Sequence, residues 1–214
     1  MKKLTLAAAL AASAFAMGAN AATTSASFNI TGKVVPSACT ISTGAENGTV
    51  DFGTISTYDK SGTFFNTKTA SLSVACDTVT TALIKVSGNN GIATDTNRFK
   101  TNQEFATYQV MVKSLQANGG AATNTILVTA TPETEVDMSN LQSSSFKKAP
   151  STAAFPYMGK YFGAATDSNE VGTFKNLTAD LTIAAYIDAE KAKDAVKDGE
   201  KDFASTLTFE LNYL

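Results

Sequence analysis

The sequence predicts an all-β fold, and three observations lead to that prediction. The segment from Leu177 to Ile187 places six apolar residues on one parity, and the final segment from Phe203 to Tyr213 does the same with five. Shorter runs rich in β-branched residues recur along the rest of the chain, and Gly, Asn and Pro separate them. About seven to nine such runs at this spacing favour a β-sandwich.

The chain opens with the features of a secretory leader. Lys2 and Lys3 precede an apolar run from Leu4 to Met17, and Ala19-Asn20-Ala21 forms an A-x-A cleavage site. We therefore expect residues 1–21 to be removed, which leaves 193 of the 214 residues for one domain. No later segment approaches the roughly 20 apolar residues of a membrane span, so we expect an exported chain that does not span a membrane.

Composition narrows the chemistry that the chain can perform. Without Lys2 and Lys3 the chain keeps 15 basic and 19 acidic side chains, so we expect neither nucleic acid nor an anionic membrane as partner. The sequence has no histidine, which excludes a Ser-His-Asp triad, a Cys-His pair and a histidine metal site built from this chain alone. We expect no catalytic activity, no cofactor and no metal.

The part of the chain before Leu177 contains the shorter strand signals. Residues 22–31 place Ala26, Phe28 and Ile30 on one face. Further along, alternation or β-branched runs predict strands at Val50–Ile55, Ser71–Cys76, Thr81–Ser87, Phe105–Leu115 and Thr125–Thr131. Residues 139–156 are rich in Ser, Lys, Ala and Pro, which indicates a surface loop.

The last part of the chain has the strongest signals. Leu177–Ile187 is the longest clean alternation, so we expect it to be a central strand. Residues 188–202 are highly charged and alanine-rich, and Gly199 is a possible helix stop, which predicts a solvated helical or loop insertion. The alternative is that residues 188–202 form a specific docking surface. The final strand contains Phe203, Leu207, Phe209, Leu211 and Tyr213 on its apolar face.

Cys39 and Cys76 are the two cysteines of the chain. In an exported protein such a pair is typical of one structural disulfide, here closing a loop of 37 residues. Two cysteines without histidine do not make a standard zinc site, and their spacing is far from the C-x-x-C of a redox pair.

Four motifs, in this order and after a leader, resemble the structural subunits of chaperone-usher fimbriae of Gram-negative bacteria. They are I-T-G-K-V-V-P-S-A-C-T-I (30–41), V-D-F-G-T-I (50–55), S-L-S-V-A-C (71–76) and the ending L-T-F-E-L-N-Y-L (207–214). The resemblance covers both ends of the exported chain. Residues 91–176 contain no matching motif, and the glycine that such subunits have shortly before the last strand is represented only by Gly199, slightly early.

The resemblance implies an incomplete immunoglobulin-like β-sandwich over residues 32–214, which lacks its seventh strand. It implies that a periplasmic chaperone first fills the groove and that the N-terminal extension of the next subunit then replaces the chaperone, with an outer-membrane usher as a further partner. Ala26, Phe28 and Ile30 would belong to the donated strand, and the final strand would form the acceptor edge. The expected location is a fimbrium at the cell surface, reached through the periplasm, with a role in adhesion.

Three alternatives remain at this point. Residues 22–31 could pair within their own domain as an ordinary first strand. The chain could be a minor or tip adhesin that binds surface glycans through Tyr157, Tyr161 and Phe162. It could also be an exported hydrolase, for which the carboxylate pairs are Glu133 with Glu135 and Asp167 with Glu170.

Overall fold

The computed structural model describes residues 38–44, 48–93, 95–96, 98–129, 146–149, 161–168 and 170–214. All described residues belong to one compact unit, Pro36–Leu214. The leader and the predicted donor residues Ala26, Phe28 and Ile30 therefore lie outside the described residues, as does most of the predicted loop 139–156.

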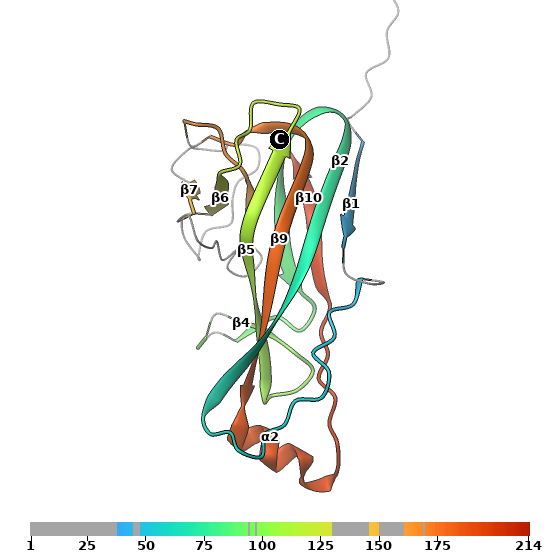
Figure 1. Ribbon diagram of the computed structural model, residues 1–214, viewed down its shortest axis with the longest axis vertical. Helices are drawn as coiled ribbons and strands as arrows, with labels where there is room; N and C mark the ends of the chain where they lie inside the picture. The colour runs from blue at the N-terminus through green and yellow to red at the C-terminus, as the bar shows by residue number, and fades with distance from the viewer. Residues whose placement is uncertain are drawn as a thin grey trace, which may run out of the picture. The chain divides into compact units, whose positions relative to one another are not determined.

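The described unit consists mainly of β-strands, which confirms the all-β prediction (Figure 1). Every strand pair among the described residues is antiparallel. In the first of two linked sheets the strands follow the order β3 (Ile92–Ala93), β4 (Arg98–Lys100), β5 (Ala106–Asn118), β9 (Thr173–Asp188), β2 (Thr63–Gly88) and β1 (Cys39–Thr43).

The second sheet contains the shorter strands and shares β2 with the first sheet. Its order is β10 (Leu207–Tyr213), β2, β8 (Tyr161–Ala164), β6 (Ile126–Thr129) and β7 (Phe146–Lys148). The two strands predicted at 71–76 and 81–87 are thus parts of one strand of 26 residues. A register shift between Ala75 and Thr80 interrupts its pairing with β9, and such a bulge bends a strand so that it can pass from one sheet into the other.

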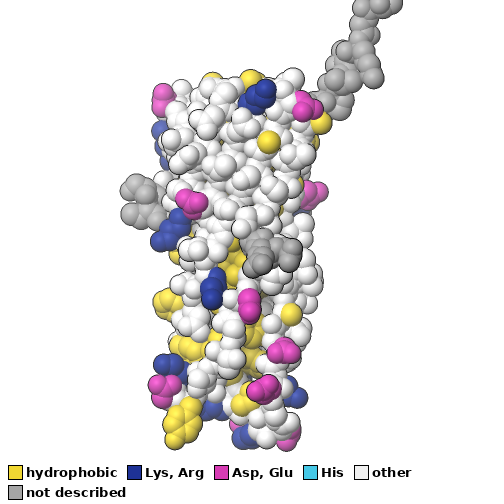
Figure 2. All heavy atoms as spheres, turned by 45° about the vertical axis from the view of Figure 1, so that its right-hand side comes forward, with side chains coloured by type: hydrophobic (Ala, Val, Ile, Leu, Met, Phe, Trp, Pro, Cys, Tyr) yellow, Lys and Arg dark blue, Asp and Glu magenta, His cyan; other side chains and the backbone are white. Residues whose placement is uncertain are grey.

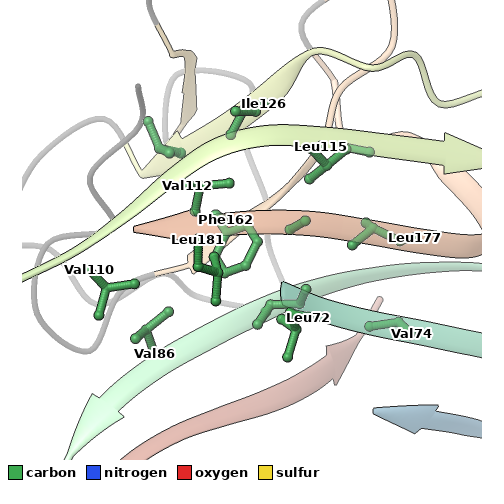
Figure 3. Packing of buried hydrophobic residues seen from close by; sticks show 14 of the residues in the cluster. Leu72, Val74, Val86, Val110, Val112, Leu115, Ile126, Phe162, Leu177 and Leu181 are labelled. Atoms are coloured by element: carbon green, nitrogen blue, oxygen red, sulfur yellow. The ribbon is translucent and has the colours of Figure 1, made fainter. Parts of the chain in front are cut away.

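The hydrophobic core combines side chains from both sheets (Figure 3). Leu72 and Val74 come from the first half of β2, whereas Ile84 and Val86 come from its second half. Phe162 in β8 is fully buried among them. Strand β9 lies between β5 and β2, so the prediction that it is central is correct, and all six apolar residues of its predicted face are buried.

The segment predicted as a strand at Val50–Ile55 is not one. Gly53 has φ of 64°, in the left-handed region, and its N–H donates to Oδ1 of Asp51 over 2.7 Å. This local turn interrupts the extended backbone that a sheet ladder requires. Val50 and Phe52 nevertheless pack against the main core as partly buried side chains.

Of the two forms predicted for the charged insertion, helix or loop, the structure has a helix over most of it. Helix α2 (Ala189–Ala195) begins at Asp188, whose carboxylate accepts hydrogen bonds from the N–H groups of Glu190 and Lys191. The helix buries Ala189 and Ala192 and leaves its charged side chains at the surface. The 3-10 turn η3 (Val196–Asp198) follows and ends at Gly199, where φ is 115°.

Candidate functional site

Strand β10 lies at the edge of the second sheet. It pairs with β2 from Leu207 opposite Gly88 to Tyr213 opposite Ala82, and within the described ranges no strand pairs with its other edge. Its side chains alternate as predicted as far as Leu211: Leu207, Phe209 and Leu211 are partly buried against the core, and Thr208 and Glu210 are exposed. Tyr213, predicted on the same apolar face, is exposed instead.

Two hydrogen bonds show which backbone groups of β10 remain unpaired. The N–H of Asn89 donates to the carbonyl of Thr206 over 3.1 Å, and the N–H of Leu214 donates to the carbonyl of Thr81 over 3.0 Å. Because hydrogen-bonded pairs alternate in an antiparallel ladder, the even-numbered residues of β10 bond to β2. The N–H and C=O groups of the odd-numbered residues therefore point to the outer edge, where no described strand receives them.

The apolar side chains beside this edge form what we call the apolar strip. It consists of the partly buried residues Val50, Phe52, Leu207, Phe209 and Leu211. Figure 2 brings this side of the domain forward and shows hydrophobic side chains along the lower half of the face, with polar atoms on both sides. Each of these side chains packs against the core and remains partly accessible to solvent.

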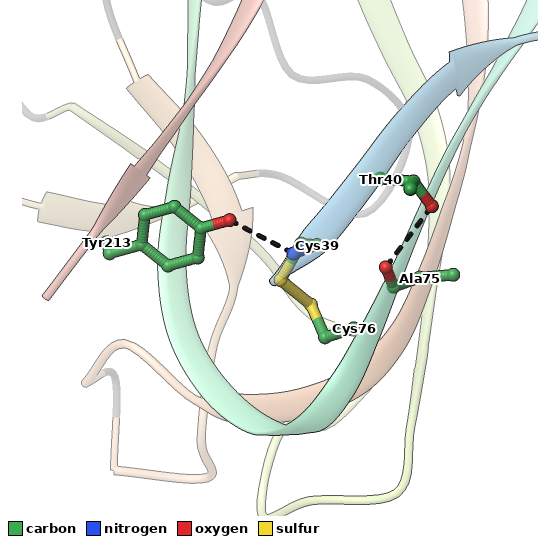
Figure 4. Close-up of a disulfide and its surroundings, with 5 residues drawn as sticks. All are labelled: Cys39, Thr40, Ala75, Cys76 and Tyr213. Carbon is green, nitrogen blue, oxygen red and sulfur yellow. Dashed lines mark hydrogen bonds between the residues drawn. A yellow bond between two sulfur atoms is a disulfide. The ribbon is translucent and has the colours of Figure 1, made fainter. Parts of the chain in front are cut away.

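A disulfide fixes one end of the strip. Cys39 in β1 is opposite Cys76 in β2, and the two are joined as predicted, with 4.0 Å between their Cα atoms. The backbone N–H of Cys39 donates to the hydroxyl of Tyr213 over 3.2 Å (Figure 4). This contact ties the end of β10 to the start of β1, and these two strands belong to different sheets.

An aromatic contact fixes the opposite end of the strip. The rings of Phe52 and Phe203 have centroids 6.2 Å apart. Phe203 precedes β10 and is not part of it, which corrects the prediction that the strand starts there. The reason is that the neighbouring Ala204 exchanges hydrogen bonds with Asn102, through the Asn102 side-chain oxygen at 2.7 Å and the Asn102 N–H at 2.9 Å, instead of with a strand.

A hydrogen-bond network around Ser205 positions the start of β10. The hydroxyl of Ser205 lies 2.9 Å from Oδ1 of Asn89 and 3.1 Å from the hydroxyl of Tyr108. The same Asn89 oxygen accepts the N–H of Thr206 over 2.9 Å. Burial raises the pKa of the Tyr108 hydroxyl, and the hydrogen bond with Ser205 opposes that rise with a smaller effect. Sequence reasoning missed this network, because Asn and Ser in a loop give no periodic signal.

Two cavities of the described unit have no residue of the apolar strip in their lining. One, of about 430 Å³, is lined mostly by polar residues around β4 and the ends of β5 and β9. The other, of about 380 Å³, lies between the loop 54–60 and the start of β2. Across the described ranges, no group of three acidic or cysteine side chains could hold a metal ion.

One of the three aromatic residues of the glycan site considered above is not available at the surface. Phe162 is fully buried, and the ring of Tyr161 is partly buried with the ammonium group of Lys85 at 5.9 Å from its centroid. Tyr157 lies outside the described residues, as do Glu133 and Glu135. Asp167 and Glu170 are exposed at the surface.

The arrangement at β10 suits recognition of an extended peptide. Its outer edge offers backbone donors and acceptors at every second residue, and the apolar strip offers contacts for alternate side chains of an added strand.

None of the helices in the described part of the chain has the length and apolar content needed to cross a membrane. Comparisons of this chain with protein-family models, with curated proteins and with solved structures find no match.

Proposed function

We propose that this chain is a structural subunit of a chaperone-usher fimbria, which polymerises by donor-strand exchange and supports cell adhesion. One observation carries the proposal: the outer edge of β10 is unpaired among the described residues, and the apolar side chains of the same strand are only partly covered. In this proposal the domain is an immunoglobulin-like sandwich without its seventh strand.

An edge of this kind is unfavourable for a protein that remains alone in solution. Unpaired N–H and C=O groups form a template for another strand, and exposed apolar surface favours association. Leu207, Phe209 and Leu211 combine both features on one strand. The chain therefore needs a partner that adds a strand, first a periplasmic chaperone and then a neighbouring subunit delivered at the outer-membrane usher.

Residues 22–31 of a second copy have the pattern that such a partner requires. Ala26, Phe28 and Ile30 alternate with polar residues, so one face of an added strand would be apolar. A donor segment at one end of the chain and an acceptor edge elsewhere on the same chain make a heterologous contact. Heterologous contacts that do not close into a ring produce filaments, which accounts for a fimbrium at the cell surface.

A synthetic peptide of residues 22–31 tests the proposal directly. We expect it to bind the purified chain and to raise the melting temperature, because binding to the native state alone stabilises that state. The matched control peptide carries Phe28→Asp and Ile30→Asp and should have no effect. A chain that melts cooperatively at high temperature as a monomer, with no response to the peptide, would overturn the proposal.

A further inference from the structure

A second sheet edge is open along the first part of β2, Thr63–Ala70. Strand β9 pairs with one side of this segment, and no described strand pairs with the other side. The carbonyl of Gly62 accepts the N–H of Ala189, which follows β9, over 2.9 Å. On the opposite side, the carbonyl of Ser71 accepts the N–H of Gly44 over 2.8 Å. Because hydrogen-bonded pairs alternate, the even-numbered residues of the segment bond to β9, and the N–H and C=O groups of the odd-numbered residues point to the open edge.

Exposed side chains accompany the unpaired backbone at this edge. The ring of Phe65 is 60% exposed, and the ring of Tyr186 contacts it from the β9 side, with centroids 5.5 Å apart. Thr67 and Thr69 follow on the same face of β2 and are also exposed. Aromatic and β-branched side chains suit a strand that packs against neighbours in a sheet. The edge therefore has both the backbone groups and the side chains that favour addition of another strand.

The open edge has a defined length. It begins directly after Gly62, whose φ of 60° lies in the left-handed region. It ends before Ser71, because Gly44 already occupies the edge at that point. The unpaired odd-numbered residues thus lie within 63–69, and Asn66 is the centre of that range. The same segment of a second copy of the chain has the matching length.

A two-fold axis at Asn66 pairs every open backbone group of the two copies. Antiparallel pairing about this axis places Phe65 opposite Thr67 of the second copy. It also places Thr63 opposite Thr69, so odd-numbered residues face odd-numbered residues throughout. The flank of the Phe65 ring that faces the open edge is then covered by a threonine side chain on the same face of the sheet.

Other positions of the axis are less favourable. An axis at Thr67 would place the start of the segment opposite Ser71, whose carbonyl already accepts the N–H of Gly44. An axis at Lys68 would place the two Lys68 side chains opposite each other, and like charges at such positions are destabilising. Lys68 is the one charged residue of the segment, and the axis at Asn66 keeps the two copies of it apart.

We propose that two copies of this chain associate through residues 63–69 of β2, as antiparallel edge strands related by a two-fold axis at Asn66. The contact uses a different edge from β10, so it does not rest on the proposed function. An isologous contact of this kind is complete with two copies. Within a fimbria it would join two filaments side by side, whereas donor-strand exchange would extend each filament.

Cross-linking of the full chain through Asn66→Cys tests the register. Facing residues in a non-hydrogen-bonded antiparallel pair have Cα atoms about 4.5 Å apart, which a disulfide can bridge. The native disulfide joins such facing residues, Cys39 and Cys76, over 4.0 Å. Under mild oxidation, most of the Asn66→Cys chain should migrate as a dimer on a non-reducing gel.

The matched control for this variant is Lys68→Cys. Lys68 is exposed on the same face of β2 as Asn66. In the proposed register the two copies of residue 68 are offset by four residues along the strands, about 13 Å. This variant should give at least about tenfold less dimer, because a disulfide cannot bridge Cα atoms that far apart.

A proline at the edge tests the hydrogen bonds. Thr67→Pro, made in the Asn66→Cys chain, removes an N–H that points to the second copy and leaves the ladder with β9 intact. The dimer yield should fall to that of Lys68→Cys. Thr67→Val keeps the N–H and should keep the dimer. The melting temperature of each variant, measured under reducing conditions, verifies that it is folded.

The outcomes separate this inference from the proposed function. An excess of the 22–31 peptide should leave the dimer intact, because that peptide is expected at β10. Loss of the dimer on addition of the peptide would assign the contact to β10 and overturn the inference. Equal yields from Asn66→Cys and Lys68→Cys, or a dimer that survives Thr67→Pro, would overturn it as well. A dimer that forms in a chain that binds no peptide would support this inference and contradict the proposed function.

Discussion

Strands β9 and β10 have the same sequence pattern but different surroundings. Each alternates apolar and polar residues, and each is antiparallel to β2. Strand β9 is also paired with β5, and Leu181 on its apolar face is 1% exposed. Strand β10 has β2 as its one partner among the described strands, and Leu211 on its apolar face is partly buried. The pattern therefore identifies which face of a strand is apolar and does not identify what covers that face.

The largest expected effect comes from comparing two single variants, in which a leucine of β9 or a leucine of β10 is replaced by alanine. Leu181→Ala should lower the free energy of unfolding by about 3–5 kcal/mol, because it leaves a cavity in a closed core. Leu211→Ala should cost about 1 kcal/mol in the isolated chain, because only part of that side chain leaves water on folding. Urea denaturation of both variants measures the difference, and equal losses would mean that β10 is covered as completely as β9.

A substitution in β10 should act more on binding than on folding. Phe209→Ala should weaken binding of the 22–31 peptide by about 1.5–3 kcal/mol, because the variant lacks the ring that the peptide would bury. Leu181→Ala, measured under conditions where that variant remains folded, is the control and should leave the affinity nearly unchanged. Titration calorimetry gives both values, and unchanged affinity of the Phe209 variant would exclude the strip as the binding surface.

The contact between β10 and β1 should have a smaller effect. Tyr213→Phe removes the hydroxyl that accepts the N–H of Cys39 and should cost about 0.5–1.5 kcal/mol, the net value of a typical hydrogen bond. Thermal unfolding of the variant with the disulfide intact measures this loss. A Tm equal to that of the parent chain would show that the contact does not hold the end of β10.

The smallest expected effect is a pH dependence at the start of β10. Burial raises the pKa of Tyr108, so the folded chain holds this proton more tightly than the unfolded chain. The stabilisation is complete below about pH 10, where an ordinary tyrosine ionises, and it is lost as the pH rises through the raised value. Tyr108→Phe should remove this part of the alkaline loss. A parent and variant with parallel stability curves between pH 9 and 11 would contradict the assignment.

Much of the fold follows from local patterns, and the exceptions have identifiable causes. Period-two alternation predicts β9, most of β10 and the parts of β2 at 71–76 and 81–87, because burial on one face requires it. It does not predict the first eight residues of β2, Thr63–Ala70. It predicts a strand at Val50–Ile55 as well, where the turn at Gly53 prevents one. The alternation also predicts the start of β10 too early, at Phe203, because the N–H and C=O of Ala204 bond to the side-chain oxygen and the backbone N–H of Asn102 instead of to a strand.

Only part of the candidate site can be predicted from the sequence. The apolar residues of β10 are evident from alternation, but its position at a sheet edge depends on the order of strands, which a single strand does not encode. Val50 and Phe52 form the other part of the apolar strip. Their alternation in V-D-F predicts sheet pairing, whereas they pack against the core without belonging to a strand. The aromatic residues Tyr157, Tyr161 and Phe162 suggest a surface site in the sequence, whereas Phe162 fills the core.

Amide hydrogen exchange along β10 tests the central claim most directly. In the monomeric chain, the N–H groups of Thr208, Glu210 and Asn212 should exchange slowly because they donate to β2, and those of Leu207, Phe209 and Leu211 should exchange quickly. Addition of the 22–31 peptide should protect the second set. Protection of Leu207, Phe209 and Leu211 in the monomer without peptide would mean that the chain already covers this edge itself, and the account would be wrong.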